Sequence, residues 1–408
     1  MIPAALIRIL YDAAAMQRWN EYPRMVELTE LDKQAHKFVI AYFLAGFEEG
    51  EVDQARLIEA GIFEFLRRVI VTDIRPDVFR EVVREKGAEL NGWVLEQLQP
   101  ALGAMEGGAF LERMREYLAG GGVGARERHL LAAAHYLATR WEFQIVYQSS
   151  RFLADAEQLR ESVEAELARY KDVKGVVEYC FGGGLAKLVD LNGRLRFQVR
   201  WAQTPRLPKT TVLGHALIVA LLTYFYSRAA GACPQRLAKT FWCALFHDLP
   251  EALTRDIVSP VKRSVVGLDA LIQEVEIQRI REKILPLAPA RLQPEFAYLL
   301  GLYPKPGGGW RKDEFEERIW RHDRAEAVAE AGAYNEDGFG AVDGRAVKAC
   351  DDLAAFTEAA ISINHGITSS ELVSGKAKIK AKYRHAKPVG SCNWHALLTE
   401  LETALAAP

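Results

Sequence analysis

The chain has 408 residues, of which 50% are apolar and 26% are charged, and its formal net charge at pH 7 is −2. This composition is typical of a soluble globular protein with two or three domains. The near-neutral balance argues against the basic surface with which proteins bind nucleic acids or anionic membranes. We therefore expect neither of these partners.

The sequence predicts a cytoplasmic location. Arg8 and Asp12 interrupt the apolar N-terminal region, which is not typical of a signal peptide. The longest apolar run, at 215–226, has 12 residues, whereas a membrane span needs about 20. The five cysteines show no CxxC pair, and Cys243 and Cys350 lie in apolar helical patterns. This usage fits a reducing compartment.

Helical patterns dominate the chain, and alternating strand patterns are almost absent. We expect an all-α fold, with one short strand candidate at 193–201 and an irregular excursion at 303–315. The clearest helical stretches are DKQAHKFVIAYFLAGF (32–47), HALIVALLTYFYSRAA (215–230), RLAKTFWCALFHD (236–248), LDALIQEVEIQRIREKIL (268–285) and AVKACDDLAAFTEAAISI (346–363).

A weak internal repeat predicts two tandem domains, with a boundary in the glycine-containing segment 172–192. Arg-Trp pairs at 18–19 and 200–201 are each followed by a helical histidine, His36 and His215. FEFLRRVIVTDIRPDV then matches FHDLPEALTRDIVSPV, and AHYLATRW resembles CDDLAAFT. Coincidence explains any one match, but four matches in the same order favour duplication.

The first copy has different residues at the positions that match His247, Asp248 and Asp351 of the second copy. Glu64 and Phe65 stand where the second copy has His247 and Asp248. His135 likewise stands where the second copy has Asp351. We therefore expect chemistry in the second copy only.

The pair His247-Asp248 ends an apolar helix, because Pro250 favours a helix end or a kink near the preceding residue. A half-buried carboxylate must be paired or must bind a cation, and a divalent metal accepts imidazole nitrogen and carboxylate oxygen together. Alone, a His-Asp dipeptide is usually a surface accident, and a helical histidine such as His215 usually belongs to the core. Together with Asp351, these residues form a candidate ligand set.

This order, H…HD…D, resembles the signature of the HD-domain metal-dependent phosphohydrolases, and more closely that of the YfbR-like 5′-deoxynucleotidase branch. HDLPEALTRDIVSPVK (247–262) resembles the motif HDxxExxTxDxxxPVK, and KACDDLAAF (348–356) resembles KxADxLxAY. The resemblance covers about residues 196–385. With the repeat, it predicts a degenerate HD-like domain at 1–175, without metal ligands, and an HD-type phosphohydrolase domain at 185–408.

The resemblance implies one divalent metal ion (Co, Mn, Mg, Zn, Ni or Fe). Its ligands, carried over by position, would be His215, His247, Asp248 and Asp351.

The resemblance also assigns roles around the metal. Glu251 would orient or deprotonate the attacking water, and Asp256 would hold the sugar or the Glu–water network. Arg200 would clamp phosphate, Trp201 would pack against the sugar or base, and Lys262 would add positive charge. Four of these have a plainer interpretation: Glu251 as a helix carboxylate, Asp256 as a helix cap, Trp201 as a core residue and Lys262 as a surface lysine.

The implied reaction is hydrolysis of a phosphomonoester, with removal of the 5′-phosphate of a (deoxy)nucleoside monophosphate or a related small molecule. The alternative is a nucleotide-sensing regulatory protein with little or no turnover. Gly214 departs from the family, which usually has Glu before the first histidine. Small members commonly form dimers, so we expect a monomeric pseudo-dimer or a homodimer.

Overall fold

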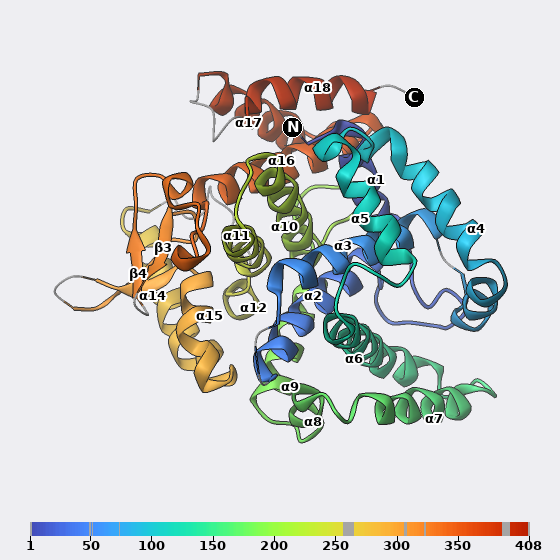
Figure 1. Ribbon diagram of the computed structural model, residues 1–408. Helices are drawn as coiled ribbons and strands as arrows, with labels where there is room; N and C mark the ends of the chain where they lie inside the picture. Colours follow the sequence, from blue (N-terminus) through green and yellow to red (C-terminus); the bar gives the residue numbers. More distant parts are fainter. Residues whose placement is uncertain are drawn as a thin grey trace.

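The computed structural model describes residues 2–48, 50, 52–72, 74–255, 265–305, 308–321, 324–385 and 392–406. Helices form most of this part of the chain, and strands occur only in two short hairpins (Figure 1). The predicted all-α class is confirmed. All five cysteines are described, and none forms a disulfide.

Two buried helices form the centre of the molecule: α2 (Glu30–Phe47) and α10 (Val212–Ala229). They lie side by side in Figure 1 and contact each other. Each starts at a threonine, Thr29 or Thr211, whose side chain accepts the backbone N–H three residues later. Such a cap satisfies a donor that the first helical turn leaves free.

Helix α10 is the one helix among the described residues that is long and apolar enough to cross a membrane. Within the folded protein, however, 89% of this stretch is buried, as in a core helix.

In the first half, α1, α3 and α6 pack against α2, whereas α4 and α5 pack on α3 and α7 packs on α6. The segment predicted as a boundary, 172–192, forms the helices α8 and α9, which also pack on α2. The bounds are α1 (Ala4–Ala15), α3 (Gln54–Val71), α4 (Pro76–Leu102), α5 (Ala109–Leu118), α6 (Ala125–Ser150), α7 (Ala156–Glu166), α8 (Lys174–Cys180) and α9 (Gly184–Gly193).

In the second half, α11 and α16 pack against α10, and α17 and α18 cover α16. Short 3₁₀ and π turns join several of these elements. The bounds are α11 (Pro234–Phe246), α12 (Glu251–Thr254), α14 (Leu268–Arg279), α15 (Gln293–Leu299), α16 (Gly344–Asn364), α17 (Ser370–Arg384) and α18 (Trp394–Ala406).

Two antiparallel hairpins lie between α15 and α16, the first of them in the predicted excursion. Strand β1 (Leu302–Pro304) pairs with β2 (Trp310–Lys312), and β3 (Arg318–Arg321) pairs with β4 (Arg324–Ala327). The buried Arg318 guanidinium holds this segment together. It donates hydrogen bonds to the backbone carbonyls of Tyr298, Leu299, Glu314 and Glu316.

The predicted strand at 193–201 is wrong. Residues Arg194–Phe197 form a 3₁₀ turn, and only Val199 makes a bridge, to Thr211. The alternation fails because Arg196, in the middle of the segment, is buried and forms an ion pair with Glu142 of α6 at 2.9 Å.

One hydrophobic core runs through both halves. At the junction of α2, α3 and α11, aromatic rings from the two halves interleave. The Phe38 and Phe241 centroids are 5.3 Å apart, and Tyr42 lies 5.2 Å from Trp242 and 5.1 Å from Phe246. Such contacts within one continuous core indicate that the halves stabilise each other.

Candidate metal centre

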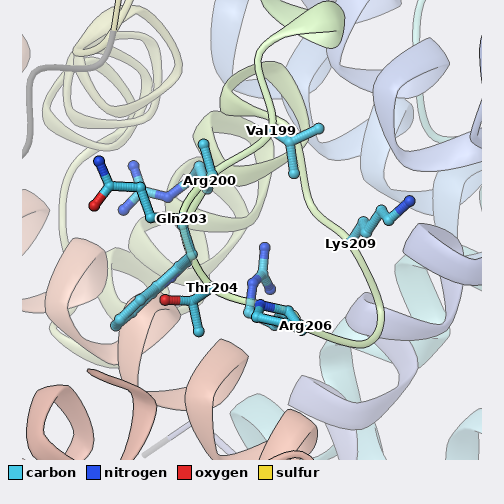
Figure 2. A pocket seen from close by; sticks show the side chains of 9 residues that line it. Val199, Arg200, Gln203, Thr204, Arg206 and Lys209 are labelled. Atoms are coloured by element: carbon cyan, nitrogen blue, oxygen red, sulfur yellow. The ribbon is translucent and has the colours of Figure 1, made fainter. Parts of the chain in front are cut away.

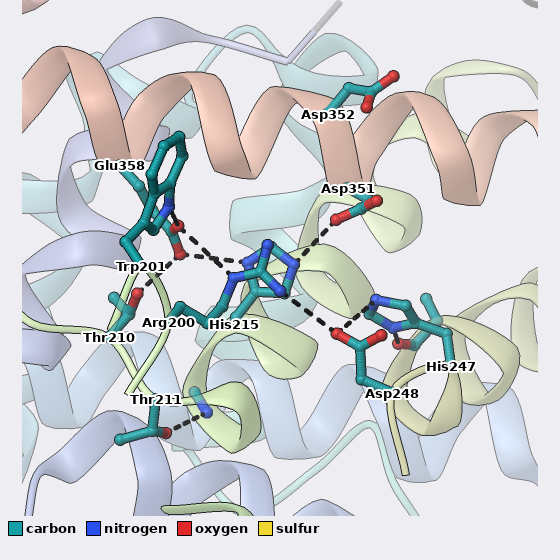
Figure 3. A network of polar contacts seen from close by, with 12 residues as sticks. Arg200, Trp201, Thr210, Thr211, His215, His247, Asp248, Asp351, Asp352 and Glu358 are labelled. Carbon is teal, nitrogen blue, oxygen red and sulfur yellow. Dashed lines mark hydrogen bonds and ion pairs between the residues drawn. The ribbon is translucent and has the colours of Figure 1, made fainter. Parts of the chain in front are cut away.

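Three elements bring the predicted ligands together (Figure 3). His215 lies in the first turn of α10, where its backbone N–H donates to Thr211 O at 2.9 Å. His247 is the residue at which α11 ends, as the proline two residues after Asp248 predicted. Asp351 lies in the middle of α16. The helix end lets the adjacent His247 and Asp248 approach the same point.

Three side chains of this set, those of His215, His247 and Asp248, lie within reach of a single ion, and Asp351 lies beside His215. His215 Nε2 is 3.0 Å from Asp351 Oδ1, and His247 Nε2 is 3.1 Å from Asp248 Oδ2. One ligand atom from each of His215, His247 and Asp248 lies within 4.8 Å of the others. Across the described ranges, this is the one group of three or more ligating side chains that meets that spacing.

The imidazole of His247 has the orientation that a metal ligand requires. Its Nδ1 donates to Ala244 O at 2.6 Å, because a carbonyl oxygen only accepts. Its Nε2 is buried and makes no well-aligned hydrogen bond within the described part of the chain. A histidine that donates through one nitrogen to the backbone presents the other to a metal.

The imidazole of His215 is oriented in the same way by Glu358, a residue that the sequence did not single out. Nδ1 of His215 lies 3.1 Å from Glu358 Oε1, so Nε2 is turned toward Asp351. A carboxylate behind a ligating histidine fixes the tautomer and raises the basicity of the ring. Glu358 could have been identified in the sequence as a carboxylate that lies two helical turns after Asp351 within an apolar helix.

Glu358 is itself held on several sides. Thr210 Oγ1 donates to it at 2.7 Å and Trp201 Nε1 at 2.9 Å, and Arg200 Nε lies at 3.7 Å. Burial would raise the pKa of Glu358, but Arg206, His215 and Arg200 hold it well below its usual range. The carboxylate is therefore ionised at neutral pH.

The two aspartates of the centre are ionised at neutral pH. Burial would raise the pKa values of Asp248 and Asp351, yet both lie below their usual range. His247 is the main cause for Asp248, and a hydrogen bond from His215 is the main cause for Asp351. The pKa of His247 is raised: burial lowers it, but the two carboxylates outweigh burial. A divalent cation is attracted by the same charges, so the residues present fit a metal ion.

The remaining predicted residues have mixed placements. Arg200 Nη1 lies 3.5 Å from Asp248 Oδ2, beside the ligands. Glu251 begins α12, its backbone N–H donates to Asp248 O at 3.0 Å, and its charge contributes to the raised pKa of Arg200. Asp256 and Lys262 lie outside the described residues.

The indole of Trp201 points into the framework of the site. Besides its hydrogen bond to Glu358, the ring lies against Gly375 of α17, where an added Cβ would be 2.8 Å from its Cη2 atom. This placement gives Trp201 a part in holding Glu358, while contact with a sugar or base stays a prediction.

A cavity of about 510 Å³ opens beside the centre along residues 199–209 (Figure 2). Arg200, Arg206 and Lys209 line it. Arg206 is buried and donates to Thr210 Oγ1 at 2.5 Å and to Pro208 O at 3.2 Å, so it stabilises the loop. The ring of Phe315 lies 6.2 Å from the ring of His247.

Residues 192–380 match the family model described as HD domain. The chain contains an HD domain. The matched range includes all four predicted ligands, Arg200 and Glu358. A crystal structure of an HD-domain phosphohydrolase from Listeria innocua is 18% identical to this chain, with a TM-score of 0.39. That match covers 55% of this chain and 90% of the other. No curated protein matches the sequence.

The turn at Arg200-Trp201, called here the Arg-Trp turn, has a local counterpart at Arg18-Trp19, outside the HD domain. Trp19 and Trp201 both have φ of 57°, and the bridge Gln17–Thr29 corresponds to Val199–Thr211. Trp19 Nε1 donates to Glu142 of α6 at 3.1 Å, as Trp201 does to Glu358 of α16. The two halves thus use the same local arrangement.

Lysine side chains stand in and next to the ligand positions of this counterpart. Counted from the threonine caps, His215 corresponds to Lys33, so the predicted pairing with His36 is wrong by three residues. Burial holds the pKa of Lys33 well below its usual range, and its Nζ lies 2.5 Å from Nδ1 of His135. The Lys37 ammonium forms an ion pair with Glu64, which stands where the second copy has His247. An amine thus replaces one ligand histidine, and the Lys37 ammonium would repel a metal ion.

Proposed function

We propose that the HD domain is a metal-dependent phosphohydrolase that removes the 5′-phosphate from a (deoxy)nucleoside monophosphate or a related small phosphomonoester. The observation that carries the proposal is the orientation of the two histidines. His215 and His247 each use Nδ1 for a hydrogen bond to the protein, and each turns Nε2 toward an ionised aspartate. Ligands held in this way are prepared for a divalent ion.

His215, His247, Asp248 and Asp351 would hold the ion. When bound, a divalent ion supplies positive charge that favours ionisation of water at neutral pH and neutralises phosphate oxygens. Two imidazoles and two carboxylates are a donor set for Zn²⁺, Mn²⁺, Fe²⁺, Co²⁺ or Ni²⁺, and Mg²⁺ prefers oxygen ligands.

Arg200 is the residue best placed to bind the phosphate. Its guanidinium borders both the ligand Asp248 and the cavity at 199–209. Its side chain is only 16% exposed, so its interaction with an anion is poorly screened by solvent. A planar guanidinium offers two parallel N–H donors to phosphate oxygens and stabilises charge that develops on them.

Glu251 is the candidate general base. It begins α12 directly after the His-Asp pair, and its carboxylate is close enough to Arg200 to raise the pKa of that guanidinium. In the proposed reaction it accepts a proton from the attacking water while Arg200 binds the phosphate. A positioned general base of this kind contributes about 10²–10⁴-fold to the rate.

The nucleotide part of the proposal is supported by the cavity and by the motif resemblance. The cavity has the volume expected for a small-molecule site. Lys209 and Arg200 both line it, and Arg200 also lies 3.5 Å from the candidate ligand Asp248 (Figure 2). A phosphomonoester could therefore place its phosphate at the metal and its organic group along the loop.

We further propose that residues 1–175 are a degenerate HD-like copy and that the chain is an intramolecular pseudo-dimer. The matching Arg-Trp turns, the matching caps and the shared core support this proposal. Lys33 stands where the HD domain has His215, and the Lys37 ammonium already pairs with Glu64, which stands in the place of His247. One ion per chain is the consequence.

A phosphate-release screen tests the proposed function. The purified chain, loaded with one divalent metal at a time, is incubated with the common ribo- and deoxyribonucleoside monophosphates. We expect release from at least one of them, and loss of release in Asp351→Asn. His135→Asn changes the counterpart position in the first half and is the matched control, with unchanged release.

Two other results would change the assignment. Tight nucleotide binding without release would favour the sensing alternative. Release that survives Asp351→Asn would remove the proposed centre from the reaction.

A further inference from the structure

The two central helices begin with nearly the same sequence motif but differ at the third helical residue. Helix α2 begins Thr29-x-x-Asp32, and α10 begins Thr211-x-x-Gly214. A carboxylate at this position commonly completes the cap of a helix that starts at threonine. Helix α10, which carries His215 one residue later, has no side chain there.

Asp32 of the first half supplies the missing group. Its Oδ2 accepts a hydrogen bond from Thr29 Oγ1 at 2.9 Å, and its Oδ1 accepts one from Thr211 Oγ1 at 2.5 Å. Asp32 is 1% exposed. One buried carboxylate therefore serves both helix starts.

The absence of a side chain at Gly214 is what allows this contact. A Cβ at position 214 would lie 2.9 Å from Asp32 Oδ1 and 3.0 Å from Leu31 Cδ2. The first value is shorter than any ordinary carbon–oxygen contact, so the Asp32 carboxylate would have to move away. Gly214 and Asp32 are thus complementary.

Thr211 connects this contact to the metal centre. Its Oγ1 accepts the N–H of Gly214 at 2.9 Å, and its carbonyl accepts the N–H of His215 at 2.9 Å. The preceding residue, Thr210, donates to Glu358, which orients the His215 imidazole. The backbone of His215 and the partner of its ring both depend on the position of residues 210 and 211.

We infer that Asp32 is a positioning residue for the metal centre: it holds the first turn of α10 from the first half of the chain. The effect on metal binding rests on the proposed function, whereas the effect on the helix start does not. The first half would therefore support the site although it holds no metal ligand.

Hydrogen exchange on the metal-free, full-length protein tests the helix start. In Asp32→Ala and in Thr211→Val we expect amides of 212–216 to exchange about fivefold faster, the usual effect of losing a threonine cap. Thr29→Val is the matched control, because it removes the same hydroxyl from the other helix. It should speed exchange at 30–34 and leave 212–216 unchanged.

Co²⁺ titration, followed by its visible absorption, tests the consequence for the centre. Asp32→Ala and Thr211→Val should each weaken Co²⁺ binding by about tenfold, at the low end of the effect of removing groups that support ligands. The double variant should lose little more than either single variant, because both remove one interaction. Thr29→Val should bind Co²⁺ as the wild type does.

Rescue distinguishes positioning from general damage. The exchange variant Asp32→Gly/Gly214→Asp moves the carboxylate to the corresponding position of α10, and it should restore both amide protection at 212–216 and Co²⁺ affinity. Asp32→Asn, which keeps one acceptor oxygen, is the milder variant if Asp32→Ala does not fold.

The results separate the two proposals. Unchanged exchange at 212–216 in both Asp32→Ala and Thr211→Val would overturn the role of Asp32. Equal loss of Co²⁺ affinity in Thr29→Val would overturn it too, because that loss would be unspecific. A wild type that binds no Co²⁺ or other divalent ion would instead refute the proposed metal centre, and the exchange data would still decide the helix start.

Discussion

Glu358 lies two helical turns beyond Asp351 on α16 and accepts a hydrogen bond from Nδ1 of His215 at 3.1 Å, while Asp351 faces Nε2 of the same ring at 3.0 Å. One helix therefore holds both sides of the imidazole. Trp201 and Thr210 in turn hold Glu358, so the Arg-Trp turn, α10 and α16 form one connected framework (Figure 3).

Glu358→Gln should weaken metal binding by about 10–100-fold, because the neutral amide neither fixes the His215 tautomer nor raises its basicity. Competition titration with a chromophoric chelator measures this affinity. Glu142→Gln makes the same change in the first half, where Trp19 is the partner. It should lower stability and leave metal affinity unchanged. Equal affinity in wild type and Glu358→Gln would contradict the prediction.

Metal analysis of the purified chain should give close to one ion per chain, and His247→Ala should lose it. The reason is that Lys33 replaces the ligand histidine in the first half and that the Lys37 ammonium occupies Glu64, the counterpart of His247. Two equivalent ions per chain, or an ion bound by residues 1–170, would show that the first half is not degenerate.

Glu251→Gln should keep the ion and lower phosphate release by about 10²–10⁴-fold, the usual contribution of a general base. The amide retains the size of the side chain but cannot accept the proton. Single-turnover kinetics with parallel metal analysis separates the two effects. An unchanged kcat would exclude Glu251 from the mechanism.

His36 should make the protein sensitive to mild acid. Burial, reinforced by Arg196, lowers its pKa to about 3, although a hydrogen bond to Val189 O opposes the shift. Between this value and the ordinary pKa of about 6.5, the unfolded chain binds a proton that the folded chain does not. The contribution of the neutral His36 to the free energy of unfolding should therefore be fully present above about pH 6.5. It should decrease as the pH falls below this value.

Urea unfolding at several pH values measures this effect. In His36→Gln the decrease between about pH 6.5 and 4.5 should be smaller than in the wild type. His365→Gln alters an exposed histidine and should behave as the wild type does. Parallel curves for wild type and His36→Gln would exclude His36 as the cause of acid sensitivity.

The fragment 185–408 should be poorly soluble or self-associating when expressed alone. It would expose the rings of Phe241, Trp242 and Phe246, which pack against α2 in the whole chain. It would also lose Asp32 from the start of α10. Size-exclusion chromatography with a phosphate-release assay checks this. A soluble, fully active monomer would show that the halves are independent domains.

The helical class and the candidate pair His247-Asp248 could be predicted from the chain itself, because both depend on local properties. Apolar spacing determines which face of a helix is buried, and Pro250 ends a helix next to His247 and Asp248 whatever surrounds it. His215 and Asp351 were then predicted from motif order. The structure places a ligand atom of His215 within 4.8 Å of those of His247 and Asp248, and it places Asp351 beside His215. The helices α8 and α9 at the predicted boundary and the two hairpins before α16 were not foreseen.

Only the tertiary structure showed which side chains support the candidate ligands and which residues of the two halves contact each other. Glu358 is one of many helical carboxylates until α10 and the Arg-Trp turn meet α16. The correspondence of His215 with Lys33, and not with His36, became visible only when the structure showed that Thr29 and Thr211 cap the two helices. Asp32 and Gly214 are 182 positions apart, and neither residue type alone indicates a contact. Sequence spacing determines the face of one helix, but the packing of two helices determines which groups on those faces meet.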